Sequence, residues 1–167
     1  DGGLYSEQLF STEGFSSDSS LLYHTHPPTQ IIKTDKPYSV MPEIAEEKML
    51  QHRSFQGFNI KPENDYLKSR KPVLVNNDCH ISLAAPAKSM EKYFFKNADA
   101  DEIIFVHEGS GKLKTQYGEL SFSYGDYLVI PRGYIYQIHF DKKDNRLFIV
   151  ESFSPVRYPK KYLSNYG

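Results

Sequence analysis

The stretch that decides the fold runs from residue 101 to residue 140 and reads DEIIFVHEGSGKLKTQYGELSFSYGDYLVIPRGYIYQIHF. Short apolar runs alternate in it with turns that contain glycine, and apolar and polar residues alternate on both sides of Gly118. Alternation with a period of two indicates β-strands, and a glycine between two such runs predicts a hairpin. Because residues 72–153 continue this pattern of closely spaced short strands, we expect a mainly antiparallel all-β sandwich or barrel with little helix.

Two spacings in this stretch match the sequence motifs of the cupin, or jelly-roll, β-barrel. Six residues separate Glu102 from Gly109, and five separate Gly125 from the turn Pro131-Arg132-Gly133. The glycines permit tight turns between strands, and the Pro-x-Gly sequence turns the chain into the next strand. We therefore expect a cupin/jelly-roll β-barrel preceded by an extended N-terminal arm.

The metal ligands of such a barrel are missing from their positions. Metal-binding cupins carry His-x-His with three or four residues between it and the glutamate, and a further histidine with two residues between it and the Pro-x-Gly turn. The first pair falls here on Lys96 and Ala98 or on Phe95 and Asn97, and the last position is Tyr136. Glu102 and Tyr136 alone do not make an Fe(II) site. We therefore predict a degenerate site, with no catalytic, cofactor-binding or metal-binding residue in this chain.

Strand alternation assigns the neighbouring side chains to two faces. If Glu102 and Tyr136 point inward, the interior is an apolar core, made with them by Ile104, Val106, Ile138 and Phe140. The outer face then carries His107, Ile103, Phe105, Ile135 and His139. An apolar outer face indicates cover by another layer, a second domain or another subunit.

Two other motifs resemble functional sites. The sequence EGSGKL has Val106 and Leu113 where a phosphate-binding loop needs glycine and a hydroxyl residue. His24 and His26, in YHTHPP, have the spacing of a metal-ligand pair on a strand, but two prolines follow directly and disfavour a continuing central strand. We favour a loop pair; the alternative is an independent metal site completed by His80 or His52.

Length and composition fit one domain of ordinary size. The chain has 167 residues, 20 basic and 21 acidic side chains and one cysteine. We expect no nucleic-acid or membrane partner, no disulfide framework and a cytoplasmic location. Residues 1–30 are assigned to the extended arm and residues 31–167 to a single barrel domain, with the strongest signal at 72–153. The stretch 43–53, EIAEEKMLQHR, is either a short helix or irregular chain.

Two long strings resemble the N-terminal part of homogentisate 1,2-dioxygenases. They are LYSEQLFSTEGFSSDSSLLYHTHPPTQI at 4–31 and NADADEIIFVHEGSGKLKTQYGELSFSYGDYLVIPRG at 97–133. The resemblance implies a two-domain cupin protein more than twice as long, which opens the ring of homogentisate with O2 in tyrosine and phenylalanine breakdown. It also implies that Fe(II) is held by histidines and a glutamate of the C-terminal domain, and that the subunits form trimers or larger assemblies.

The resemblance sets the functional expectation. Since the chain begins at Asp1 rather than Met and no iron ligand maps onto it, we expect a fragment that lacks the iron-binding domain. By itself it would be an inactive, metal-free structural and assembly barrel, whose partners are the C-terminal cupin domain and further copies of the protein. The alternative is a stand-alone metal-free cupin that binds a small molecule in a roomy polar cavity near Tyr136.

Overall fold

The computed structural model describes residues 3–16, 19–46, 49 and 51–165. The chain divides into two compact units, Asp1–Met41 and Pro42–Gly167. Among the described residues, no helix combines the length and the apolar character needed to cross a membrane.

The first unit is built on a β-hairpin. Strand β1 (Ser6–Ser11) pairs antiparallel with β2 (Ser19–His24), and Gly14 in the connection has a φ of +65°. The sequence had indicated only an extended arm here. An isolated two-stranded hairpin is at best marginally stable in water, and apolar side chains such as Leu9 and Leu21 remain about half exposed.

Between the hairpin and the first helical turn, the described part of residues 25–56 contains turns and bends but no helix or strand. The described residues of the stretch 43–53 are therefore irregular chain, the second of the two predicted alternatives. Residues 47, 48 and 50 of that stretch lie outside the described part of the chain.

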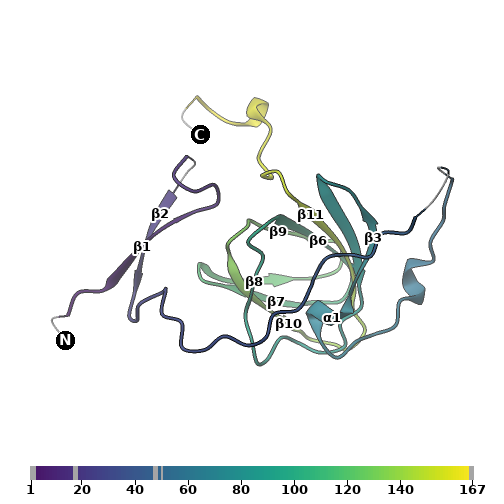
Figure 1. Cartoon of the computed structure of the whole chain (residues 1–167), viewed down its shortest axis with the longest axis horizontal. Helices are drawn as coiled ribbons and strands as arrows, with labels where there is room; N and C mark the ends of the chain where they lie inside the picture. The colour runs from purple at the N-terminus through teal and green to yellow at the C-terminus, as the bar shows by residue number, and fades with distance from the viewer. Residues whose placement is uncertain (1–2, 17–18, 47–48, 50, 166–167) are drawn as a thin grey trace. The chain divides into compact units, whose positions relative to one another are not determined.

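The second unit contains two antiparallel sheets that face each other (Figure 1). The larger sheet has the order β3 (Arg70–Val75), β4 (Cys79–Ala84), β11 (Arg146–Ser152), β6 (Asp101–Glu108), β9 (Tyr127–Ile130). The smaller has the order β5 (Phe95–Lys96), β10 (Ile135–Phe140), β7 (Gly111–Thr115), β8 (Gly118–Phe122). In the described part of this unit, the helical elements are short turns: η1 (Gly57–Asn59), α1 (Tyr66–Ser69) and η2 (Lys160–Tyr162). The predicted all-β class with little helix is confirmed.

The core lies between the two sheets. Ile104 and Val106 of β6 meet Ile138 of β10 there, and each is at most 1% exposed. The inward face predicted from strand alternation is therefore correct, although Phe140 at the end of β10 is only partly buried. Burying such apolar side chains on both inner faces is the main favourable term that holds a β-sandwich together.

The motif glycines make the turns that their spacing predicted. Gly125 and Gly133 have φ values of +89° and +82°, where side chains are disfavoured. Gly109 has a φ of +120°, and a Cβ atom there would also collide with the buried side chain of Asn145. The turn after β6 therefore needs glycine for both its backbone conformation and its close packing.

Candidate functional site

The two degenerate ligand positions meet in the interior of the barrel. Glu102 comes from β6 of the larger sheet and Tyr136 from β10 of the smaller one, and both are 0% exposed. The Tyr136 hydroxyl donates a hydrogen bond of 2.6 Å to Oε2 of Glu102. The barrel thus brings together, from opposite sheets, the two residues that the motif spacing singled out.

A third strand supplies the cation that neutralises this carboxylate. Nη1 of Arg70, the first residue of β3, lies 2.6 Å from Oε1 of Glu102. Nη2 of Arg70 is 3.2 Å from Oε2 of Glu151, close enough for an ion pair but not aligned as a hydrogen bond. The Arg70 side chain is only 10% exposed, so water screens its charge poorly.

The helical turn α1 fixes where Arg70 enters the barrel. Asp65 caps its N-terminus by accepting a hydrogen bond of 2.9 Å from the Lys68 amide. Arg70 is the C-terminal cap, and its amide donates to the Leu67 carbonyl. The side chain therefore leaves a constrained backbone rather than a free loop.

The structure also decides between the two possible positions of the missing histidine pair. Phe95 pairs with Tyr136 in the sheet, and their rings lie edge to face with centroids 5.6 Å apart. Nδ2 of Asn97 donates to Oε1 of Glu151 at 2.9 Å and lies 3.4 Å from Oε1 of Glu102. Lys96 and Ala98 are exposed. Phe95 and Asn97 are therefore the positions that face the site.

Burial controls protonation in this cluster. Burial first, and then the nearby Tyr66 and Glu102, raises the pKa of Tyr136 well above its ordinary value, so the phenol stays neutral. Burial likewise raises the pKa of Tyr66, against the opposing effect of Arg70. For Arg70, burial lowers the pKa, but interactions with Tyr66, Glu102, Tyr136 and Glu151 outweigh it and leave the pKa raised. The cluster is therefore one fixed guanidinium beside two carboxylates and two neutral phenols.

These residues do not fit the divalent metal of a metal-binding cupin. Both oxygens of Glu102 are already engaged, one by Arg70 and one by Tyr136. The remaining ligand positions offer an amide and a phenyl ring, whereas Fe(II) and Mn(II) sites need histidine and carboxylate donors. Nowhere in the described ranges do three His, Cys, Asp or Glu side chains gather as a metal site would require.

The alternative histidine pair is not assembled into a site either. His24 ends β2, and its Nε2 atom lies 2.9 Å from Oε1 of Gln8. His26 follows in an exposed bend, and His52 is exposed too. His80 packs its ring against Phe153, with centroids 4.9 Å apart. Among the described residues, none of these histidines is grouped with two further His, Cys, Asp or Glu side chains.

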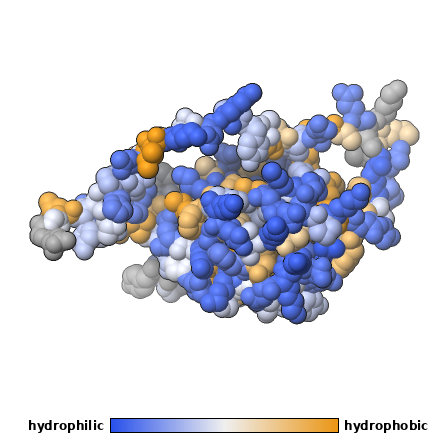
Figure 2. All heavy atoms as spheres, turned by 90° about the horizontal axis from the view of Figure 1, so that it is seen from below, coloured by the Kyte–Doolittle hydropathy of each residue, from blue (hydrophilic) through white to orange (hydrophobic). Residues whose placement is uncertain are grey.

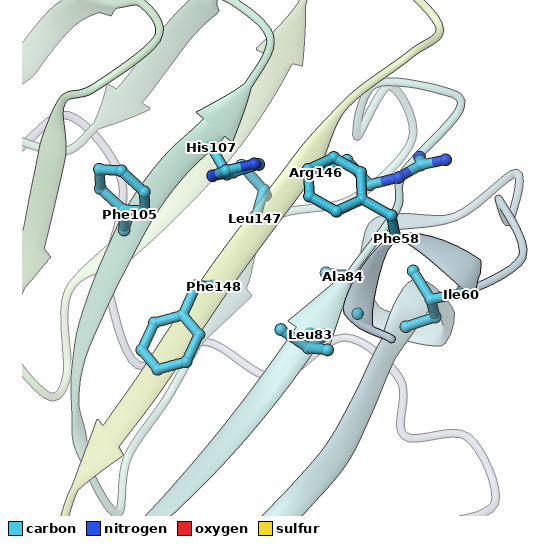
Figure 3. Close-up of a pocket in the computed structure, with 10 residues that line it drawn as sticks. Phe58, Ile60, Leu83, Ala84, Phe105, His107, Arg146, Leu147 and Phe148 are labelled. Atoms are coloured by element: carbon cyan, nitrogen blue, oxygen red, sulfur yellow. The ribbon is translucent and has the colours of Figure 1, made fainter. Parts of the chain in front are cut away.

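A second feature lies on the outer face of the larger sheet. An apolar hollow of about 250 Å³ is lined by Leu83 of β4, Phe105 of β6, Phe148 of β11 and Phe58 of η1 (Figure 3). The His107 imidazole stands between the rings of Phe58 and Phe105, with centroids 4.7 and 6.1 Å away. This agrees with the apolar outer face expected from strand alternation. On the face shown in Figure 2, hydrophobic residues are exposed among the hydrophilic ones.

Sequence reasoning missed the central residue of the interior cluster. Arg70 precedes the apolar run PVLV, where a lone arginine normally indicates the solvated end of a strand. Tyr66 and Glu151 were missed as well, because all three reach the site from strands or turns far from the two motifs. The only available signal was indirect: a glutamate predicted to face a closed apolar interior must have a partner of opposite charge.

Comparison with known proteins identifies a family and two relatives. The family described as "Homogentisate 1,2-dioxygenase N-terminal" matches residues 3–161. A protein of Saccharolobus solfataricus named as a dioxygenase is 36% identical over 167 residues, which are all of this chain and 43% of that protein. The homogentisate 1,2-dioxygenase of Nitrobacter hamburgensis is 24% identical over 168 residues, covering 90% of this chain and 37% of that enzyme. The chain thus spans less than half the length of these relatives.

Solved structures resemble the barrel in fold alone. A conserved protein of unknown function from Streptococcus pyogenes matches with a TM-score of 0.51 and 12% identity, over 71% of this chain and all of the other. A cupin-2 domain protein from Shewanella frigidimarina matches with a TM-score of 0.44 and 23% identity, over 50% of this chain and 79% of the other. The two facing antiparallel sheets, with the motif glycines in their expected turns, confirm the predicted fold class, and the match across residues 3–161 places the chain in the homogentisate 1,2-dioxygenase N-terminal family.

Proposed function

We propose that this chain acts as the N-terminal barrel of an Fe(II)-dependent dioxygenase that opens the ring of homogentisate in tyrosine and phenylalanine breakdown. The family match and the two dioxygenase-named relatives support the reaction class. The chain spans only 43% and 37% of those relatives. We assign the iron to a C-terminal cupin domain of the same protein and propose that this protein is cytoplasmic.

The residues at the cupin ligand positions are the main support for placing the iron in another domain. In this barrel they hold Phe95, Asn97, Glu102 and Tyr136, and the two oxygens of Glu102 are engaged by Arg70 and Tyr136. A site of this composition supplies neither an open coordination position nor a base within reach of solvent. The barrel's own contribution is therefore structural, and chemistry belongs to another domain.

Assembly is the structural role that the outer face supports. The hollow around Phe148 exposes apolar side chains on the larger sheet, with Phe58 54% and Phe148 38% exposed. Apolar patches of this kind on folded domains commonly mark contacts with another domain or subunit. We assign the C-terminal cupin domain and further copies of the protein, in a trimer or larger assembly, as the partners of this barrel.

Oxygen consumption tests the proposal directly. Fe(II) and homogentisate are added to the isolated chain and, in parallel, to the full-length protein, and O2 uptake is followed with an electrode. We expect turnover by the full-length protein and none by the isolated chain. A full-length variant with His24→Ala and His26→Ala is the control, and it should retain activity because this pair is not an iron site. Substantial uptake by the isolated chain would refute the proposal.

The competing function, a stand-alone metal-free cupin that binds a small molecule, needs a roomy polar cavity near Tyr136. That space is filled, since Tyr136 is 0% exposed and packs against Tyr66 and Phe95. The hollow around Phe148 is apolar and lies on the outside of the larger sheet. The geometry therefore favours the assembly role.

A further inference from the structure

We propose that the guanidinium of Arg70 takes the place of the metal ion in this barrel, so that the cupin ligand positions surround a cation that belongs to the chain itself. The inference concerns the barrel alone and does not depend on which reaction the parent protein catalyses.

The Arg70 guanidinium lies beside the cupin ligand positions. The motif spacing names four ligand positions; in the structure two of them lie against the Arg70 guanidinium, and the other two contact the carboxylate that it binds. Glu102 binds Nη1 of Arg70 at 2.6 Å, and the Phe95 ring centroid lies 5.9 Å from its Cζ atom. Tyr136 and Asn97 both reach the same Glu102 carboxylate, at 2.6 and 3.4 Å. Arg70 therefore sits on the carboxylate that would be the anionic metal ligand.

The positive charge of Arg70 compensates the buried Glu102 carboxylate. A carboxylate that is 0% exposed is very costly unless a cation and hydrogen bonds compensate it. In a metal-binding cupin the metal ion provides that compensation. Here Arg70 supplies it to Glu102 and, at 3.2 Å, to Glu151. Since arginine does not lose its proton in proteins, the charge is as permanent as that of a metal ion.

Arg70 also joins strands that are not neighbours in the sheet. The guanidinium connects β3 with β6 and β11, although in the sheet order β4 separates β3 from both. Through Glu102 and Tyr136 the connection continues to β10 of the opposite sheet. A metal ion in a cupin also joins strands of the two sheets at one point. The aromatic rings of Tyr66 and Phe95, each within 6 Å of the Cζ atom of Arg70, complete a pocket suited to a planar cation.

Chemical rescue tests this assignment. The substitution Arg70→Ala removes the atoms of ethylguanidinium and leaves the rest of the pocket, so the probe is ethylguanidinium chloride at low millimolar concentration. We expect the Tm of Arg70→Ala to lie well below that of the native chain and to rise with ethylguanidinium concentration, as binding to the folded state requires. Ethylammonium chloride, which has the charge without the planar fork, should have little effect.

The control variant is Arg132→Ala. Nε of Arg132 lies 3.2 Å from Asp101, but that carboxylate keeps hydrogen bonds from the amides of residue 132 and Val156, so it remains compensated when the arginine side chain is removed. Neither this variant nor the native chain should gain stability from ethylguanidinium. A folded Arg70→Ala protein whose Tm responds equally to ethylguanidinium and ethylammonium would overturn the proposal.

Two measurements on the native chain keep the proposal testable if Arg70→Ala does not fold. In ¹⁵N NMR spectra at neutral pH, the Nη protons of Arg70 should give separate, slowly exchanging signals; averaged signals like those of free arginine would overturn the assignment. Mn²⁺ alone should not raise the Tm of the native chain. A rise that Glu102→Gln abolishes would show that a metal, rather than Arg70, uses the site.

Discussion

Removing the charge of Glu102 measures how much the interior ion pair contributes to the barrel. The substitution Glu102→Gln preserves the size of the side chain and an oxygen for the Tyr136 hydroxyl, but it leaves Arg70 buried without its closest counter-charge, 2.6 Å away. Breaking a buried pair by removing one partner costs about 3–5 kcal/mol. Because Glu151 remains 3.2 Å from Arg70 and is 22% exposed, we expect the lower end, about 3 kcal/mol.

Urea-induced unfolding at pH 7 gives this free energy. The chain has 13 tyrosines and no tryptophan, so tyrosine fluorescence together with far-UV circular dichroism reports the transition. The matched control is Glu119→Gln, which breaks the ion pair with Lys112 at the same N–O distance of 2.6 Å, but at 54% and 41% exposure. The control should unfold at nearly the urea concentration of the native chain. Equal shifts of the urea midpoint in both variants would show that burial does not increase the contribution of the Arg70–Glu102 pair to the free energy of unfolding.

Three further changes test other parts of the structure. Tyr136→Phe should reduce the loss of stability at alkaline pH. Burial raises the pKa of Tyr136 in the folded state, so the contribution of its neutral phenol to the free energy of unfolding is complete below about pH 10 and is lost above it, by about 1.4 kcal/mol per pH unit. The free energy of unfolding measured from pH 8 to 11 checks this. Gly109→Ala should destabilise the barrel more than Gly118→Ala in urea unfolding, because both glycines have positive φ values but only a Cβ at 109 collides with Asn145; equal losses would attribute the whole effect to φ. Phe148→Lys should leave the fold unchanged by circular dichroism and weaken association of the full-length protein in sedimentation velocity, and an unchanged sedimentation coefficient would exclude this face as an assembly contact.

The parts of the fold that sequence predicted well are those fixed by local spacing. The glycines at 109, 125 and 133 adopt positive φ values, which few other residues adopt, so their spacing predicts the turns. Strand alternation from those turns then predicts that Glu102 and Tyr136 point inward, and both are buried. These features depend on residues within one or two strands of each other, which is the range over which periodicity carries information.

The partner of Glu102 could not be predicted in the same way. Arg70 lies 32 residues earlier, on a strand that is separated from β6 by two others in the sheet. Its contact depends on how the sheet curves around the interior rather than on strand pairing. The β1–β2 hairpin was missed for a different reason: none of the residues in its strands is buried, and serines at the strand ends interrupt the apolar pattern.

An internal guanidinium gives the barrel a fixed stoichiometry. A protein held together by a metal ion gains stability in proportion to the logarithm of the free metal concentration, and a chelator removes that gain. Arg70 arrives with the polypeptide, one per barrel, and its effective concentration beside Glu102 is set by the chain. The proposed role of Arg70 would therefore make folding of this unit independent of the cell's metal supply.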